Sequence, residues 1–66
     1  MNFCENLLDL RTKAGLTQLQ VAKGSGMSYR TYQNYEYGLR EPKMTALISL
    51  ADFYDISIDE LVCRER

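Results

Sequence analysis

Apolar side chains recur at helical spacing in successive segments of the chain, separated by glycine, proline and capping residues. The first segment spans residues 2–14, with inward positions 3, 7, 10 and 14 on one face. The second spans residues 17–25 and the third residues 28–37, followed by a loop and a fourth helix over residues 44–54. A short fifth helix follows. Because no segment alternates with the period of a strand, the pattern predicts an all-α globule of five helices.

Residues that favour helix ends stand at the boundaries of these segments. Thr17 and Ser57 are each followed three residues later by Gln or Glu, the spacing of a capping box, and Ser28 is expected to cap the third helix. Glycine follows the first three helices at positions 15, 26 and 38, and Pro42 prevents an earlier start of the fourth helix. The expected inward residues of the last two helices are Met44, Leu47, Leu50, Ala51, Ile58, Leu61 and Val62.

Residues 16–37 have the spacing of two short helices joined at a tight turn. Ala22 stands where two helices approach closely, Gly26 where the chain reverses, and Tyr32 where the second of these helices packs against the first. Tyr35 is also expected to face inward. Gly24 has no role in this scheme, and glycine there is expected to weaken the end of its helix by about 1 kcal/mol relative to alanine.

Length and composition limit the functions that this chain can have. Its 66 residues, 45% hydrophobic and 26% charged, fit one globular domain over residues 1–66. There is no histidine, and Cys4 and Cys63 are expected to be free thiols, so neither an ordinary zinc site nor a Cys-His nucleophile can form. We expect no enzyme activity, no cofactor and no metal. The longest apolar run is too short to span a bilayer, which predicts a cytoplasmic protein without membrane contact.

Charge is unevenly distributed along the chain. The net charge is −1 and the pI about 5.2, which alone argues against a polyanionic partner. Residues 11–43, however, carry six basic and two acidic side chains, whereas residues 44–66 sum to −3. A bipolar domain of this kind can place its positive middle on a DNA duplex while its acidic end faces away.

Three segments together resemble the phage-repressor and Cro-like helix-turn-helix family of XRE-type regulators: LLDLRTKAGLTQLQVA, GMSYRTYQNYEYGLREP and LISLADFYDISIDEL. The resemblance covers almost the whole chain. It implies a compact five-helix, lambda-repressor-like DNA-binding domain, with the helix-turn-helix over about residues 17–37. Members often pair an arginine on the first helix with a glutamate at the end of the recognition helix, here Arg11 and Glu36. The residues agree, because a carboxylate beside inward tyrosines needs a cation or several donors.

The resemblance also implies which residues meet DNA. Bases would be read from the outer face of the third helix, where arginine suits guanine and amides suit adenine; the candidates are Tyr29, Arg30, Gln33 and Asn34. Gln18 would contact a phosphate or the recognition helix itself. The full set of phosphate candidates is Thr17, Gln18, Thr31, Arg40 and Lys43.

Two functions follow from these observations. The first is sequence-specific DNA binding by a transcriptional regulator, expected to be a repressor that binds a palindromic operator as a homodimer, with no small-molecule ligand. Leu8, Leu39 and the fifth helix are the candidate interface surfaces. The alternative is a protein-interaction module, an antitoxin, anti-repressor or adaptor that keeps the fold with little or no DNA binding. The acidic pI and departures from the family pattern at Ser25, Tyr32 and Leu39 keep this alternative open.

Overall fold

The computed structural model describes residues 2–62. These residues form helices and connecting loops, without a strand in the described range. The helices, in chain order, are α1 (Phe3–Lys13), α2 (Gln18–Gly24), α3 (Tyr29–Glu36), α4 (Met44–Tyr54) and α5 (Ile58–Leu61). The all-α, five-helix fold predicted from the sequence is confirmed. None of the helices in residues 2–62 is long and apolar enough to cross a membrane.

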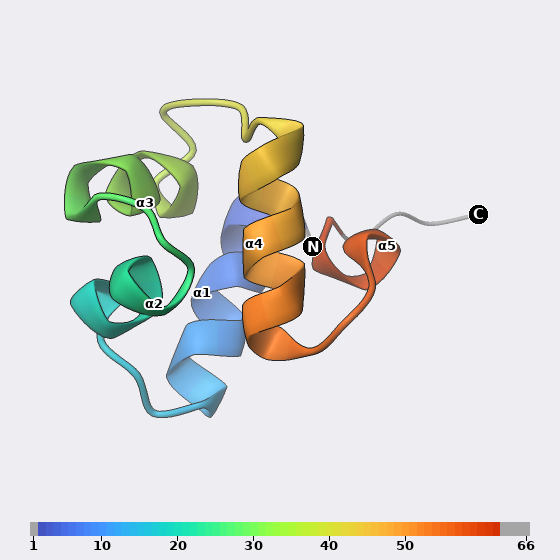
Figure 1. Ribbon diagram of the computed structural model, residues 1–66, viewed down its shortest axis with the longest axis horizontal. Coiled ribbons are helices and arrows are strands. Elements are labelled where there is room, and N and C mark those ends of the chain that lie inside the picture. The colour runs from blue at the N-terminus through green and yellow to red at the C-terminus, as the bar shows by residue number, and fades with distance from the viewer. Residues whose placement is uncertain (1, 63–66) are drawn as a thin grey trace.

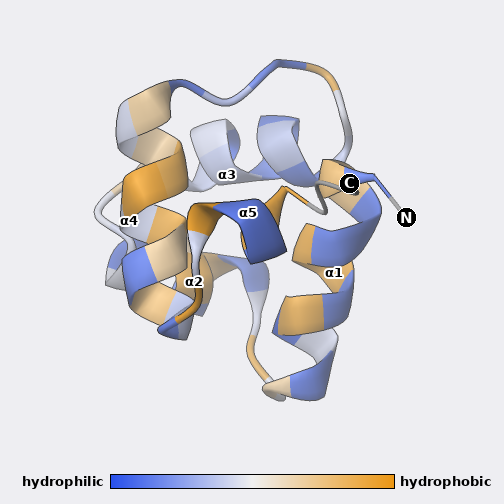
Figure 2. Cartoon of the chain, turned by 90° about the vertical axis from the view of Figure 1, so that its right-hand side faces the viewer, coloured by the Kyte–Doolittle hydropathy of each residue, from blue (hydrophilic) through white to orange (hydrophobic). Residues whose placement is uncertain are grey.

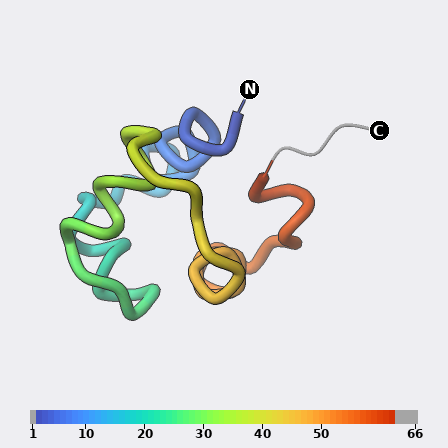
Figure 3. Tube along the Cα trace, turned by 90° about the horizontal axis from the view of Figure 1, so that it is seen from above, coloured from blue at the N-terminus to red at the C-terminus, as the bar shows by residue number. Residues whose placement is uncertain are grey.

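The helices form two groups on either side of α4. In Figure 1, α2 and α3 lie on one side of α4, α5 lies on the other, and α1 passes behind. The view from above agrees: α4 is seen end-on between the α2–α3 pair and α5 (Figure 3). α2 packs on α3, α1 contacts both α3 and α5, and α4 contacts α5. The helix-turn-helix is therefore at one end of the domain, away from α5.

Side-chain caps define where the helices begin. Thr17 accepts a hydrogen bond from the backbone N–H of Gln20, and the Gln20 side chain accepts one from the Thr17 backbone. Ser57 and Glu60 form the same reciprocal box at α5. Ser28 caps α3 through its side-chain oxygen. These contacts satisfy backbone donors that a helix leaves unpaired, so local sequence fixes the starts of these helices.

The chain leaves four of the helices through a residue of positive φ. Gly15, Gly26 and Gly38 have φ of 69°, 73° and 74° after α1, α2 and α3. After α4 the same conformation is adopted by Asp55, with φ of 55°. At each of these ends the backbone N–H of the residue after the turn donates a hydrogen bond to the carbonyl five residues earlier. The N–H of Leu16, for example, donates to the carbonyl of Arg11. Asp55 is the one non-glycine residue with positive φ among those described.

The core lies where α1, α2, α3 and α4 meet, and α5 closes it with one buried leucine. Its buried members are Leu7, Val21, Ala22, Tyr32, Tyr35, Leu50, Ala51 and Leu61. Figure 2 shows hydrophobic colours on α1 and α4, whereas α3 is pale to blue. The recognition helix is thus held in the core by two tyrosines, as the sequence predicts, rather than by aliphatic residues.

Two residues expected in the core lie outside it. Ala14 is exposed because α1 ends at Lys13 and Ala14 is its cap, beyond the last packed turn. Met44 is 62% exposed because it opens α4, where the helix extends past the core. Ile48, one turn further on, is 45% exposed and shares its face. α4 therefore keeps an exposed apolar strip of Met44 and Ile48 in addition to its buried side.

Gly24 has a packing role that the sequence did not show. A Cβ atom at this position would lie 2.1 Å from Cε1 of the Phe53 ring. The ring of Phe53 therefore rests directly on the backbone at the end of α2, and it also meets Tyr54 edge-on. Absence of a side chain at Gly24 allows α4 to approach the helix-turn-helix closely.

Candidate nucleic-acid interface

Arg11 and Glu36 form a bidentate ion pair between α1 and the end of α3. Arg11 Nε donates to Glu36 Oε2 at 2.9 Å, and Arg11 Nη2 donates to Glu36 Oε1 at 3.0 Å. Nη1 of Arg11 also donates to the backbone carbonyl of Leu16, at 3.0 Å. The Glu36 side chain is 3% exposed and that of Arg11 18%. One guanidinium group thereby joins three parts of the chain, namely α1, the α1–α2 loop and α3.

The environment of this pair keeps Glu36 ionised. Burial alone raises the pKa of the Glu36 carboxyl group, but hydrogen bonds from Arg11 and Gln18 outweigh burial and hold this pKa below its usual value. Two phenols lie nearby. Burial, reinforced by the Glu36 charge, raises the pKa of Tyr32 above its usual value and that of Tyr54 to about 12. Neither hydroxyl has a hydrogen-bond partner of normal geometry among the described residues.

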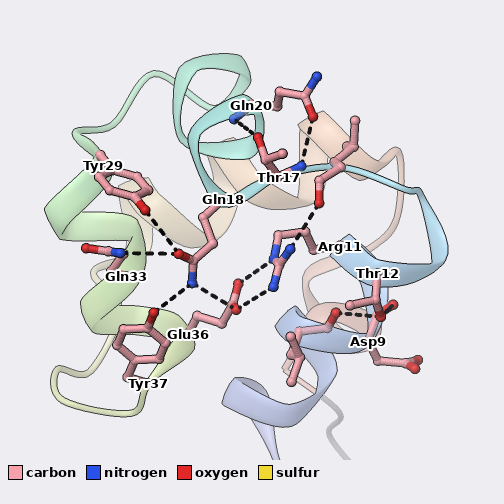
Figure 4. Close-up of polar contacts among 12 residues, drawn as sticks. Asp9, Arg11, Thr12, Thr17, Gln18, Gln20, Tyr29, Gln33, Glu36 and Tyr37 are labelled. Carbon is pink, nitrogen blue, oxygen red and sulfur yellow. Dashed lines mark hydrogen bonds and ion pairs between the residues drawn. The ribbon is translucent and has the colours of Figure 1, made fainter.

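Gln18 is the centre of a polar network on the surface of the helix-turn-helix (Figure 4). Its Nε2 donates to Glu36 Oε1 at 3.1 Å and to the Tyr37 hydroxyl at 3.2 Å. Its Oε1 accepts from Gln33 Nε2 at 3.2 Å and, more weakly, from the Tyr29 hydroxyl at 3.4 Å. The first residue of α2 is thus bound along the whole length of α3. Of the two contacts expected for Gln18, the structure shows the one to the recognition helix.

The four candidate base-reading residues lie on α3, in two different settings. Arg30 is exposed, and its side chain makes no hydrogen bond or ion pair with another residue in the range 2–62. Tyr29 is 46% exposed, although its hydroxyl reaches Gln18. Gln33 and Asn34 are half-buried, and Gln33 alone of these two is tied to Gln18. Among the residues described, Arg30 is therefore exposed without a side-chain partner and Asn34 is half-buried without one, whereas Tyr29 and Gln33 are held by α2.

The remaining phosphate candidates lie at the start of α2, on α3 and in the loop after α3. Thr17 caps α2, and Thr31, in the first turn of α3, accepts a hydrogen bond from Ser28 at 2.8 Å. Arg40 and Lys43 are exposed in the loop between α3 and α4. Tyr37 was not singled out from the sequence, yet it is 58% exposed and bonded to Gln18. Its only sequence signal is its position one residue after Glu36.

The structure also describes the residues that could hold a metal and two of those expected at an interface. Within residues 2–62 there is no cluster of three or more side chains suited to hold a metal ion. Cys4 is a free, half-buried thiol, and Cys63 lies outside the described residues. Leu8 and Leu39, two of the expected interface residues, are 43% and 71% exposed.

Several proteins are similar to this chain in sequence or in structure. A transcriptional repressor of the cryptic phage CTXphi, RstR from Vibrio cholerae, is 42% identical over 60 residues, which cover 91% of this chain and 54% of RstR. A transcriptional regulator from Listeria innocua has a crystal structure that superposes with a TM-score of 0.87 at 38% identity, covering 97% of this chain and 60% of that one. The chain spans about half the length of the curated relatives it matches.

A relative of nearly the same length also has a known structure. The restriction-modification controller protein C.AhdI from Aeromonas hydrophila superposes with a TM-score of 0.84 at 34% identity, covering 89% of each chain. Residues 7–61 match the helix-turn-helix family model, a range that begins within α1 and ends with α5. This chain therefore belongs to the helix-turn-helix family of XRE-type transcriptional regulators.

Proposed function

We propose that the protein is a sequence-specific DNA-binding transcriptional regulator that inserts α3 into the major groove. The observation that carries this proposal is the way α3 is held. Its inner face is fixed by Tyr32, Tyr35 and the Arg11–Glu36 pair, while its outer face presents polar side chains suited to base edges. The base-reading set is Tyr29, Arg30, Gln33 and Asn34.

Phosphate contacts on both sides of the groove would position this helix. The amino end of α2 places Thr17 and Gln18 beside α3, and Thr31 lies in the first turn of α3 itself. Arg40 and Lys43 supply positive charge in the loop beyond it. Such contacts fix register and orientation and carry no sequence information by themselves. The acidic α5 region lies on the far side of α4 and does not oppose docking (Figure 1).

We infer that residues 1–66 act as one domain and bind DNA as a homodimer. One short helix makes few base contacts, so useful specificity needs two half-sites about 34 Å apart on a palindromic operator. Apolar residues outside the core are available for a modest symmetric contact: Leu8, Leu39, Met44 and Ile48, together with α5. Repression follows if the operator overlaps a promoter. The protein would act in the bacterial cytoplasm, the compartment that holds the DNA, without a small-molecule ligand.

The test is a selection of bound sequences from a randomised duplex pool at stated salt, repeated with Arg30→Ala. Arg30 is exposed, so the variant should fold normally and lose base preference at one position of each half-site. Lys43→Ala is the matched control, expected to weaken all sequences equally. Equal weakening of all sequences by Arg30→Ala would make Arg30 a phosphate contact. Absence of any selected sequence at low salt would favour the protein-interaction module instead.

A further inference from the structure

The network around Gln18 has a hydrogen-bond direction that chemistry imposes. Arg11 can only donate, and an ionised carboxylate such as Glu36 can only accept. Glu36 Oε1 lies 3.1 Å from the Gln18 side-chain amide, so the group that Gln18 turns toward Glu36 has to be its NH₂ group. The carbonyl oxygen of Gln18 is thereby forced to the other side, toward Tyr29 and Gln33.

The orientation of the Gln18 amide also determines the orientation of the Gln33 amide on α3. Because Gln18 Oε1 accepts, Gln33 has to turn its own NH₂ group toward Gln18, at 3.2 Å. Figure 4 shows the result: the Gln33 oxygen points away from Gln18. It has no partner among the described residues, and one N–H of Gln33 also remains free. Without Gln18 the two ends of the Gln33 amide would be interchangeable by rotation about one bond.

We propose that the buried Glu36 carboxylate, acting through Gln18, sets the orientation of Gln33 so that it presents its carbonyl oxygen to a base amino group. This inference rests on the proposed DNA binding. The major-groove edges that offer an amino group are adenine N6 and cytosine N4. Adenine also offers N7 as an acceptor for the free N–H of Gln33, so adenine is the expected base. Gln18 and Glu36 are positioning residues in this scheme, and Gln33 is the residue that touches the base.

The same direction gives Tyr37 a role. Its hydroxyl accepts from Gln18 Nε2 at 3.2 Å, which leaves its proton free for an outside acceptor. Tyr29 is the opposite case, since its hydroxyl proton is directed at Gln18 Oε1. Tyr37 is 58% exposed at the end of α3, and the acceptor that DNA offers beside the groove is a phosphate oxygen. The network therefore assigns the Tyr37 hydroxyl to a phosphate and the Tyr29 hydroxyl to the support of Gln18, and it leaves the exposed part of the Tyr29 ring for a base.

The first experiment uses the selected operator and measures affinity for all four base pairs at every position. Gln33→Ala identifies the position that Gln33 reads, by abolishing preference there. The native protein should prefer adenine at this position about ten-fold. Gln18→Ala, which leaves Gln33 in place, should reduce that preference to about two-fold or less. A Gln33-dependent preference for guanine or thymine, whose edges accept, would overturn the proposed direction, as would an unchanged preference in Gln18→Ala.

A second experiment compares Tyr37→Phe with Tyr29→Phe, two changes that each remove one hydroxyl from a partly exposed ring. Tyr37→Phe should weaken binding about ten-fold for all sequences alike, because it removes a hydrogen bond to a charged acceptor. Tyr29→Phe removes only the hydroxyl that faces Gln18 and keeps the ring that is proposed to meet a base, so it should change overall affinity by no more than about two-fold. Equal effects of the two changes, or a base-specific effect of Tyr37→Phe, would overturn the assignment.

A third measurement needs no DNA and separates this inference from the proposed function. In the free protein, NMR should show both side-chain amide protons of Gln18 protected from exchange with water, and one of the two protons of Gln33 unprotected. Lys43→Ala, outside the network, should leave this pattern unchanged. Glu36→Gln replaces two acceptor oxygens by one oxygen and one NH₂ group, so it should reduce the protection of the Gln18 proton that faces position 36. Unprotected Gln18 protons in a protein that still binds its operator would overturn the inference and leave the function standing. A protein with the protected pattern that binds no duplex would instead contradict the function.

Discussion

The hydrogen bonds on the two sides of α4 end on different kinds of group. On the α2–α3 side, hydrogen bonds of Gln18 and the Arg11–Glu36 pair join side chains to one another near the surface. On the α5 side, Leu61 is buried in the core, and Asn6 of α1 donates to the backbone carbonyls of Glu60 and Leu61 at 3.0 and 2.9 Å. Hydrogen bonds are directional, so bonds between side chains fix the orientation of those side chains, whereas bonds to backbone carbonyls fix the position of a helix. The α2–α3 side is therefore the one suited to hold side chains for recognition.

The net charge also differs between the part of the chain that holds the helix-turn-helix and the part that holds α4 and α5. Residues 11–43, which include the helix-turn-helix and the loop after it, carry a net charge of +4, and residues 44–66 sum to −3. The difference orients the domain on a polyanion even though its total charge is −1.

The largest effect is expected for Glu36→Ala. It leaves the Arg11 guanidinium, 18% exposed, without its partner, and removes an acceptor from Gln18. Breaking one partner of a buried pair costs about 3 to 5 kcal/mol, a large fraction of the stability of a small domain. Urea unfolding of both single variants and of Arg11→Ala/Glu36→Ala gives the coupling. A double variant that loses the full sum of the two single losses would show that the pair is not coupled.

Acid should weaken the Arg11–Glu36 pair. The pKa of Glu36 is lowered in the folded protein, so its contribution to stability is complete above the unfolded value of about 4.3. The contribution is lost as pH falls from there through the folded pKa. Glu36→Gln is the matched control, because the other carboxyl groups titrate in both proteins. The difference in unfolding free energy between the two should shrink as pH falls from 6 toward 2; a constant difference would contradict the lowered pKa.

Gly24→Ala tests the contact between α2 and α4. Alanine in a helix is normally better than glycine by about 1 kcal/mol. Here its Cβ would meet the Phe53 ring at 2.1 Å, and overpacking of this kind costs about 1 to 3 kcal/mol. We therefore expect a net loss of stability in thermal unfolding. In a Phe53→Leu background the same change should be neutral or stabilising, and a loss there equal to that in the native background would exclude Phe53 as the cause.

The sequence predicted those features that depend on neighbouring residues. The caps at Thr17, Ser28 and Ser57 and the glycine at position 26 are local signals, and the helices begin and end close to where they indicate. The Arg11–Glu36 contact spans 25 residues, and it was available only through the resemblance to a family and the needs of a buried carboxylate.

The remaining features depend on contacts between distant residues or on the position of a helix in the fold. Nothing near Gly24 in the sequence indicates that a ring 29 residues away covers it. The exposure of Met44 depends on how far α4 extends past the core, which periodicity does not show. The position of Tyr37 in the Gln18 network requires knowing where α2 crosses α3. The roles of the base and phosphate candidates in DNA binding stay predictions.

The smallest effect is expected at the end of α4, where an aspartate replaces the glycine found after the first three helices. Asp55 has φ of 55°, a conformation that costs a residue with a Cβ atom about 1 kcal/mol, and its charge lies at the negative end of the helix dipole. Asp55→Gly should therefore stabilise the domain by about 0.5 to 1 kcal/mol, after the greater freedom of glycine in the unfolded chain is subtracted. Gly15→Ala is the matched control: its φ is 69°, and a Cβ there meets nothing within 4 Å. This change should destabilise by a similar amount through conformation alone. If thermal unfolding showed no gain for Asp55→Gly but the expected loss for Gly15→Ala, the aspartate side chain would have to make a compensating contact in the folded protein.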